Sequence, residues 1–114
     1  GAGSLLSSSY YALPRPPTPG SYYRYNVYAY YFPHTTSGTW KCEIRENGIL
    51  NSALLQKDIS GYSATNKGRT VMSVGSIQID SSTSGVDIDL TAIAAGSGGN
   101  ATLFLDALVF VRVQ

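Results

Sequence analysis

The sequence predicts an all-β protein, an antiparallel β-sandwich with jelly-roll-like order. Several stretches alternate apolar and polar residues, and clusters of glycine, serine, asparagine and proline separate them. No stretch repeats apolar residues at helical spacing over three turns. Charged residues make up 13% of the chain, about half the ~25% of ordinary soluble domains, and tyrosine, serine, threonine and glycine take their place. A chain of 114 residues is expected to form one domain.

Residues 1–20 are expected to form an arm and a proline-rich linker ahead of a β-sandwich domain at 21–114. A short strand is predicted within residues 4–13. Residues 14–20 then hold four of the five prolines, which favours stiff polyproline geometry. Two interpretations stay open, a semi-rigid linker or an arm that docks on a neighbouring subunit. The start at glycine indicates either a cloning scar over residues 1–4 or a processed N-terminus.

The tyrosine-rich stretch 21–32 holds six of the nine tyrosines and is predicted to be the first long strand. Successive side chains of a strand point to opposite faces. The face expected to join the core carries Tyr23, Tyr25, Val27, Ala29 and Tyr31. The opposite face, which suits contact with a partner, carries Tyr22, Arg24, Asn26, Tyr28, Tyr30 and Phe32.

The next predicted strand, residues 39–47, has the clearest alternation in the chain. Trp40, Cys42 and Ile44 are expected to face the core, with charged residues between them. Cys42 is the single cysteine, so no disulfide can form within the chain, and it is interpreted as a small core residue. Asn47-Gly48 then predicts a tight type I′ turn, with residues 49–55 returning as the partner strand.

The second half of the domain is predicted to contain a long surface loop and three more strands. The loop covers residues 57–69 and is followed by a strand at 70–80, with Val71, Ile77 and Ile79 on one face. Gly75 inside that strand indicates a bulge or a close backbone approach. Residues 86–92 alternate regularly and predict a further strand.

The last predicted strand, residues 102–113, is apolar on both faces. Strict alternation puts Leu103, Leu105, Ala107, Val109, Val111 and Val113 on one face. A strand buried on both sides in a small sandwich needs an additional cover, and a neighbouring subunit is the simplest one. The opposite face of this strand is therefore predicted to form a subunit interface, made of Phe104, Leu108, Phe110 and Arg112.

Charge and motifs argue against several classes of function. The net charge is +1 with scattered basic residues, which disfavours nucleic-acid binding. The chain contains no run of about 18 apolar residues, so insertion into a membrane is not predicted. His34 is the single histidine and lies in a polar turn, where a surface role is the simpler interpretation. Sequence motifs of hydrolases, zinc proteases and phosphate loops are missing, so a non-enzymatic protein is predicted.

No cofactor is predicted, and calcium is the one ion for which the sequence offers candidate ligands. Asp80, Asp87 and Asp89 are weak candidate calcium ligands, because oxygen ligands at strand ends can hold this ion. Ordinary solvation explains the alternation of Asp87 and Asp89 equally well. Asp106 lies among apolar residues and is expected to pair with an arginine such as Arg24 or Arg45. Asn100-Ala101-Thr102 fits the N-glycosylation pattern.

Tyrosine rings on the surface are the strongest functional signal, because a flat ring with a hydroxyl serves both sugar stacking and protein interfaces. Two interpretations remain open, packing against another surface or a ligand platform. The loops 33–38, 57–69 and 94–100 are expected to carry recognition. The candidate ligand-binding residues are Tyr28, Tyr30, Arg24, Asn26, Tyr62 and Asn66.

Several landmarks resemble the jelly-roll heads of the complement-globular-head and tumour-necrosis-factor-like superfamily, including phage tail-fibre tips. They are Pro19-Gly20-Ser21-Tyr22-Tyr23, Glu46-Asn47-Gly48-Ile49 and the apolar stretch 103–113. The resemblance covers about residues 19–113 and implies a trimer that binds receptors through its loops. Residues 105–110, read Leu-Asp-x-Leu-x-Phe, also resemble the closing motif of sandwich-type carbohydrate-binding modules.

Three hypotheses of function follow. The first is a self-assembling β-sandwich, extracellular or on a virion surface, that recognises a cell-surface glycan or protein as a receptor-binding or adhesion head. The second is a subunit of an extracellular filament or pilus, in which residues 1–13 complete a neighbour's sheet by strand addition. The third is a carbohydrate-binding module of a larger enzyme. A homo-oligomer, either a trimer or a filament, is expected from the first two.

Overall fold

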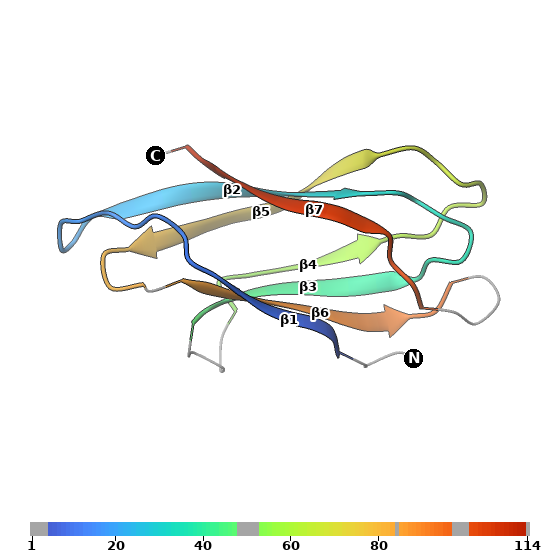
Figure 1. Ribbon diagram of the computed structural model, residues 1–114, viewed down its shortest axis with the longest axis horizontal. Coiled ribbons are helices and arrows are strands. Elements are labelled where there is room, and N and C mark those ends of the chain that lie inside the picture. The colour runs from blue at the N-terminus through green and yellow to red at the C-terminus, as the bar shows by residue number, and fades with distance from the viewer. Residues whose placement is uncertain (1–4, 48–52, 84, 97–100, 114) are drawn as a thin grey trace.

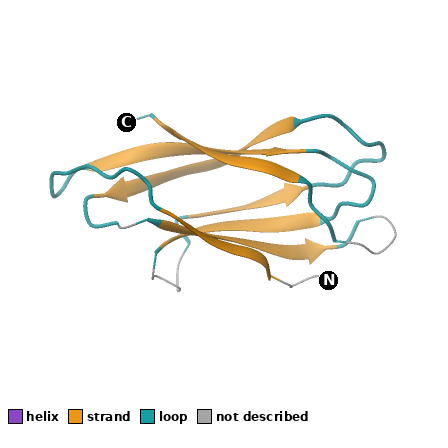
Figure 2. Ribbon diagram, viewed as in Figure 1, coloured by secondary structure: helices purple, strands orange, loops and turns teal. Residues whose placement is uncertain are grey.

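The computed structural model describes residues 5–47, 53–83, 85–96 and 101–113. This part of the chain is all-β, as predicted, and Figure 2 shows strands and loops without a helix. Accordingly, it contains no helix of the length and apolar character needed to cross a membrane. The seven strands are β1 (Leu5–Tyr11), β2 (Tyr22–Tyr31), β3 (Thr39–Glu46), β4 (Leu55–Ser60), β5 (Thr70–Asp80), β6 (Val86–Ala94) and β7 (Leu105–Arg112).

The strands form two antiparallel sheets that face each other as a β-sandwich. One sheet has the order β1-β6-β3-β4 and the other β5-β2-β7, and Figure 1 shows them as two layers. The pairing is nested around the β3–β4 hairpin, since β2 pairs with β5 and β1 with β6. The folded ribbon then rolls up, which brings β6 beside β3 and β7 beside β2. This rolled ribbon is the jelly-roll-like order that the sequence predicts.

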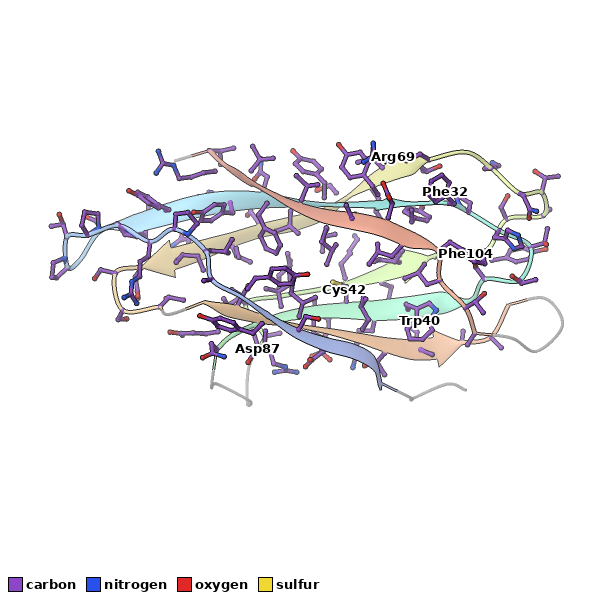
Figure 3. The ribbon with its side chains drawn as sticks, in the orientation of Figure 1. Phe32, Trp40, Cys42, Arg69, Asp87 and Phe104 are labelled. Carbon is purple, nitrogen blue, oxygen red and sulfur yellow. The ribbon has the colours of Figure 1, made fainter. Side chains whose placement is uncertain are left out.

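The core lies between the two layers and follows the predicted alternation of β2. Tyr25, Val27, Ala29 and Tyr31 are buried, while Tyr23 is half-buried at the end of the strand. Figure 3 shows side chains of both layers, including Trp40 and Cys42, meeting in this space. The other buried apolar side chains are Ile44, Ile59, Val74, Ile77, Ile79, Val86, Ile88, Leu90 and Ala92.

The N-terminal segment packs on its own chain. Strand β1 pairs with β6 from Leu5↔Thr91 to Tyr11↔Val86 and so becomes the edge of the four-stranded sheet. The proline-rich stretch is also anchored, because Tyr25 Oη donates a hydrogen bond to Pro14 O at 2.6 Å and Arg15 Nη1 donates one to Thr83 O at 3.2 Å. The short strand predicted within residues 4–13 is therefore present and belongs to the sheet of its own chain.

The predicted tight hairpin after β3 is wrong. The returning strand β4 is Leu55–Ser60 rather than residues 49–55, and Ile44 pairs with Leu55 across a connection longer than two residues. Gly48 lies outside the described residues. Strand β4 was hidden within the predicted loop because Gln56, Lys57 and Asp58 are exposed at a sheet edge. The loop itself begins at Gly61.

The bulge predicted at Gly75 is present, and it reverses the predicted side of Val71. The β2–β5 register passes from Val27↔Gly75 to Tyr28↔Ser73, so the residue between Gly75 and Ser73 is extra. Val74 is consequently buried, and Val71 is 51% exposed on the outer face. Ile77 and Ile79, which lie beyond the bulge, are buried as predicted.

A second bulge corrects the face assignment of β7. The β2–β7 register passes from Tyr30↔Ala107 to Tyr31↔Leu105, which leaves Asp106 unpaired in the ladder. As a result Leu108 and Phe110 lie opposite the buried Ala29 and Val27 and pack on the core, and Leu105 also packs there. The outward face instead carries Ala107, Val109 and Val111, which lie opposite Tyr30, Tyr28 and Asn26.

We predict a graded loss of stability when three glycines are replaced by alanine. Gly75 has φ +137° and a Cβ there would lie 2.6 Å from Leu55 Cδ1, whereas Gly20 has φ +86° with open space around it. Gly75→Ala should lower the free energy of unfolding by about 2 kcal/mol and Gly20→Ala by about 1 kcal/mol. Urea denaturation measures both changes.

Gly68→Ala is the matched control, because no atom lies within 4 Å of the added Cβ and the backbone is not in the left-handed region. Its stability should stay within about 0.5 kcal/mol of the unchanged protein. Equal stabilities of Gly75→Ala and Gly68→Ala would contradict the assigned bulge.

Candidate functional site

The outer surface of the three-stranded sheet, here called the tyrosine face, is the first candidate site. The alternation of β2 places Arg24, Asn26, Tyr28 and Tyr30 on it, as predicted. The two bulges add apolar side chains that strict alternation had assigned to the core side, since an extra residue in a strand inverts the facing of all that follow. A hollow of about 300 Å³ on this face is lined by Tyr28, Tyr30, Val71, Met72, Ser73, Val109 and Val111.

Arg69 borders this hollow at the end of the strands. Its guanidinium carbon lies 4.0 Å from the centre of the Tyr30 ring, and its Nε donates to Asp106 Oδ2 at 2.7 Å. Figure 3 shows Arg69 on the outward side of the layer that contains β2 and β7. Asp106 thus has an arginine partner, but the predicted identities were wrong. Arg24 bonds Gln78 instead, at 3.0 Å.

Arg45 lies on the opposite sheet, whose outer face has a different character. Glu43 is only 8% exposed there and pairs with both Arg45 and Lys41, the latter at 3.1 Å. Arg45 Nε also lies 3.9 Å from Asp89 Oδ2. This face therefore carries ion pairs around the buried carboxylate of Glu43, while the tyrosine face carries rings and valines.

The loops at one end of the sandwich form a second candidate site, here called the loop end. Residues 32–38, 61–69 and 101–104 meet there (Figure 1). His34 N donates to Gly61 O at 3.0 Å, and Gly38 N donates to Thr102 O at 3.0 Å. A hollow of about 500 Å³ is lined by Gly38, Thr39, Ser60, Tyr62, Ala95 and Gly96.

The predicted recognition loops are thus neighbours in space. The two candidate ligand-binding residues on them, Tyr62 and Asn66, differ in their exposure and contacts. Tyr62 is 47% exposed and its ring borders the hollow. Asn66 serves the loops themselves, because its Oδ1 accepts a hydrogen bond from Thr35 N at 3.1 Å. The six predicted ligand-binding residues accordingly divide into four on the tyrosine face and two at the loop end.

His34 has a structural role in this loop end. Its Nδ1 accepts a hydrogen bond from Thr36 N at 3.1 Å and lies 2.8 Å from Thr36 Oγ1. The imidazole ring also packs against Phe104, with 4.8 Å between ring centres. Phe104, which the sequence analysis placed in a subunit interface, remains 44% exposed beside it (Figure 3).

The candidate calcium ligands are not gathered into one cluster. Among the described residues, no group of three or more histidine, cysteine or acidic side chains could hold a metal ion. Asp87 Oδ1 accepts a hydrogen bond from Asn47 Nδ2 at 3.0 Å. Asp80 Oδ1 accepts from Ser82 Oγ at 2.6 Å, and the bonds from this turn lower the pKa of Asp80. Asn100, the candidate glycosylation site, lies outside the described residues.

Cys42 is buried in the core, as predicted. Burial of the thiol raises its pKa from 9.0 to about 11, and the nearby Glu43 and Asp89 carboxylates act in the same direction. The folded state therefore keeps a proton that the unfolded chain releases above pH 9. The resulting stabilisation is complete below pH 9 and is lost as the pH rises toward 11.

We expect Cys42→Ala to remove this pH dependence. The difference in unfolding free energy between the unchanged protein and the variant should shrink by up to about 2 kcal/mol from pH 8 to pH 11. Urea denaturation at several pH values gives this difference, in which the titration of other groups cancels. A difference that stays constant over the whole range would show that the Cys42 pKa is not raised.

Comparison with known proteins gives no relative from which a role could be inferred. No family model, no curated protein and no solved structure matches the chain. The resemblance to jelly-roll heads and to carbohydrate-binding modules therefore remains an expectation.

Proposed function

We propose that this chain is a non-enzymatic recognition module, extracellular or on a virion surface, that self-associates and binds a glycan through its tyrosine face. The hollow between Tyr28, Tyr30 and Val109 is the observation that carries the proposal. Sugars bind to flat rings through their apolar C–H faces while their hydroxyls need hydrogen-bonding partners at the rim, and tyrosine offers both.

The geometry of β2 supports this assignment. Tyr28 and Tyr30 are two residues apart on one strand face, which spaces their rings by roughly 7 Å, near the length of one sugar unit. Both rings are half-buried, so their positions are held by the sheet. Polar groups follow in both directions, with Asn26 and Arg24 along the strand and the Arg69–Asp106 pair at the other end. Hydroxyl-rich ligands match this mixture of rings and fixed polar groups.

The contrast between the two outer faces supports a partner on this side. On the four-stranded sheet, Lys41, Glu43 and Arg45 neutralise one another's charges in ion pairs. The tyrosine face instead exposes Val71 and Val111, at 51% and 44%. Grouped apolar side chains on a surface mark contact with another molecule.

We expect Tyr28→Ala and Tyr30→Ala each to weaken glycan binding about tenfold, because each removes one stacking ring. A glycan array identifies the bound sugar, and titration calorimetry with that sugar measures the loss. Tyr62→Ala in the same experiment tests the loop end as the competing site. Loss of binding in Tyr62→Ala alone would move recognition to that end.

Tyr22→Ala serves as the matched control. Tyr22 lies on the same strand and is 41% exposed, but it is outside the hollow between Tyr28 and Tyr30. Its replacement should leave the affinity within about twofold of the unchanged protein. If all three tyrosine variants of β2 bind equally well, the tyrosine face is not the glycan site.

A further inference from the structure

Beside the tyrosines of β2, the outer face of β5 carries a second row of side chains. In the β2–β5 ladder Val71 pairs with Tyr30 and Ser73 pairs with Tyr28, so each lies next to one ring. Arg69 directly precedes β5, and its guanidinium rests on the ring of Tyr30. Arg69, Val71 and Ser73 thus form a row parallel to the two tyrosines, here called the β5 row.

The β5 row is apolar at its centre and polar at its ends. Val71 is 51% exposed and lines the hollow of the tyrosine face. Arg69 bonds Asp106 through Nε, which leaves the N–H groups on its Nη atoms without an acceptor among the described residues. Ser73 also lines the hollow, and its hydroxyl has no partner in the described part of the chain. A ligand over this row therefore meets a donor, an apolar contact and a hydroxyl.

A plain sugar does not match the β5 row. Its ring carries hydroxyl and hydroxymethyl groups, and a hydroxyl placed against Val71 loses hydrogen bonds to water without a replacement. An acidic sugar fits no better, because its carboxylate would approach Arg69 beside the carboxylate of Asp106, which already pairs with the guanidinium. The row instead suits an uncharged group that combines an apolar end with a hydrogen-bond acceptor and a donor.

An acetamido group has these properties. It carries a methyl group, a carbonyl oxygen that accepts hydrogen bonds and an N–H that donates one. The C=O and N–H of a trans amide point in opposite directions, so groups at the two ends of the β5 row can serve them separately.

The spacing of the strands agrees with the size of this group. Neighbouring strands lie about 4.8 Å apart. In an N-acetylated sugar the methyl carbon lies about 3.8 Å from the ring carbon that bears the amide, like two Cα atoms across a trans peptide. A sugar ring stacked on the tyrosines of β2 would therefore place its acetamido group over β5.

We propose that the glycan bound by the tyrosine face contains an N-acetylated hexosamine, which the β5 row selects through its acetamido group. The sugar ring stacks on Tyr28 and Tyr30. Its amide carbonyl accepts a hydrogen bond from an Arg69 Nη, the methyl group packs on Val71, and the amide N–H donates to Ser73 Oγ. This inference rests on the proposed function and deepens it, because it names the class of sugar.

Paired oligosaccharides test the selection directly. The trimers of N-acetylglucosamine and of glucose with the same linkage differ in one substituent per sugar, an acetamido group in place of a hydroxyl. The trimers of N-acetylgalactosamine and of galactose form a second pair. Titration calorimetry should give at least roughly tenfold tighter binding for the acetylated member of one pair or both. Equal affinities within both pairs would overturn the inference.

The apolar contact at Val71 is tested by Val71→Thr. Threonine keeps the branched shape that suits a strand, but it places a hydroxyl against the methyl group of the ligand. The affinity for the acetylated trimer should fall about fivefold, while the affinity for the plain trimer stays within about twofold. Val113→Thr is the matched control, since Val113 is 52% exposed, close to the 51% of Val71, and lies outside the hollow.

The hydroxyl of Ser73 is tested by Ser73→Ala. This change removes the acceptor of the amide N–H and should weaken binding of the acetylated trimer about fivefold. Ser76→Ala is its control, because Ser76 is exposed on the same strand, opposite Asn26, but lies outside the hollow. Circular dichroism confirms that the variants fold. A preference for acetylated trimers that survives both Val71→Thr and Ser73→Ala would show that the β5 row does not select the sugar.

Failure of this inference can be told apart from failure of the proposed function. A glycan array presents acetylated, plain and deoxy sugars together. If the array shows binding of sugars without an acetamido group, and Tyr28→Ala weakens that binding, the tyrosine face is a glycan site but the acetamido selection is wrong. Preferred binding of deoxy sugars, which carry a methyl group but no amide, has the same meaning. If no glycan binds, the proposed function fails and the selection fails with it.

Discussion

Strand β2 is the constraint on which the rest of the molecule depends, because it is the only central strand of the three-stranded sheet in the described part of the chain. It forms ladders with β5 on one side and β7 on the other. Its side chains therefore serve two purposes at once. Val27 and Ala29 are fully buried and set the spacing of the two layers, while Tyr28 and Tyr30 on the reverse side define the outer surface. A shift of β2 by one residue would exchange these roles and expose the core.

The buried faces of the regularly alternating strands could be predicted from the sequence. The side-chain directions beyond the two bulges could not. Alternation in β2 and β3 identified buried residues such as Tyr25, Trp40 and Ile44 correctly. The two bulges were the obstacle, because one extra residue inverts every later side chain. Gly75 indicated the first bulge, but strict alternation still assigned Val71 to the same face as Ile77 and Ile79. Nothing in the stretch around Asp106 marks the second.

Those bulges also explain why the candidate site was only half predicted. The tyrosines and polar residues of β2 were placed on the correct face, since β2 itself alternates without interruption. Their valine neighbours were assigned elsewhere, because they belong to the strands that carry the bulges. The hydrogen bond of Asn66 could not be predicted for another reason: it joins Asn66 to Thr35, 31 residues away in sequence. Contacts of that kind have no local pattern.

The contact between β4 and β5 has a consequence for how large an assembly can grow. These strands close one side of the sandwich, so the far strand of the three-stranded sheet is partly shielded by its neighbour in the other layer. Within the described residues, the edges on the other side of the sandwich are those of β1 and β7. Growth into fibres requires two complementary edges per molecule. The β4–β5 contact thus confines strand pairing with other molecules to the opposite side of the sandwich.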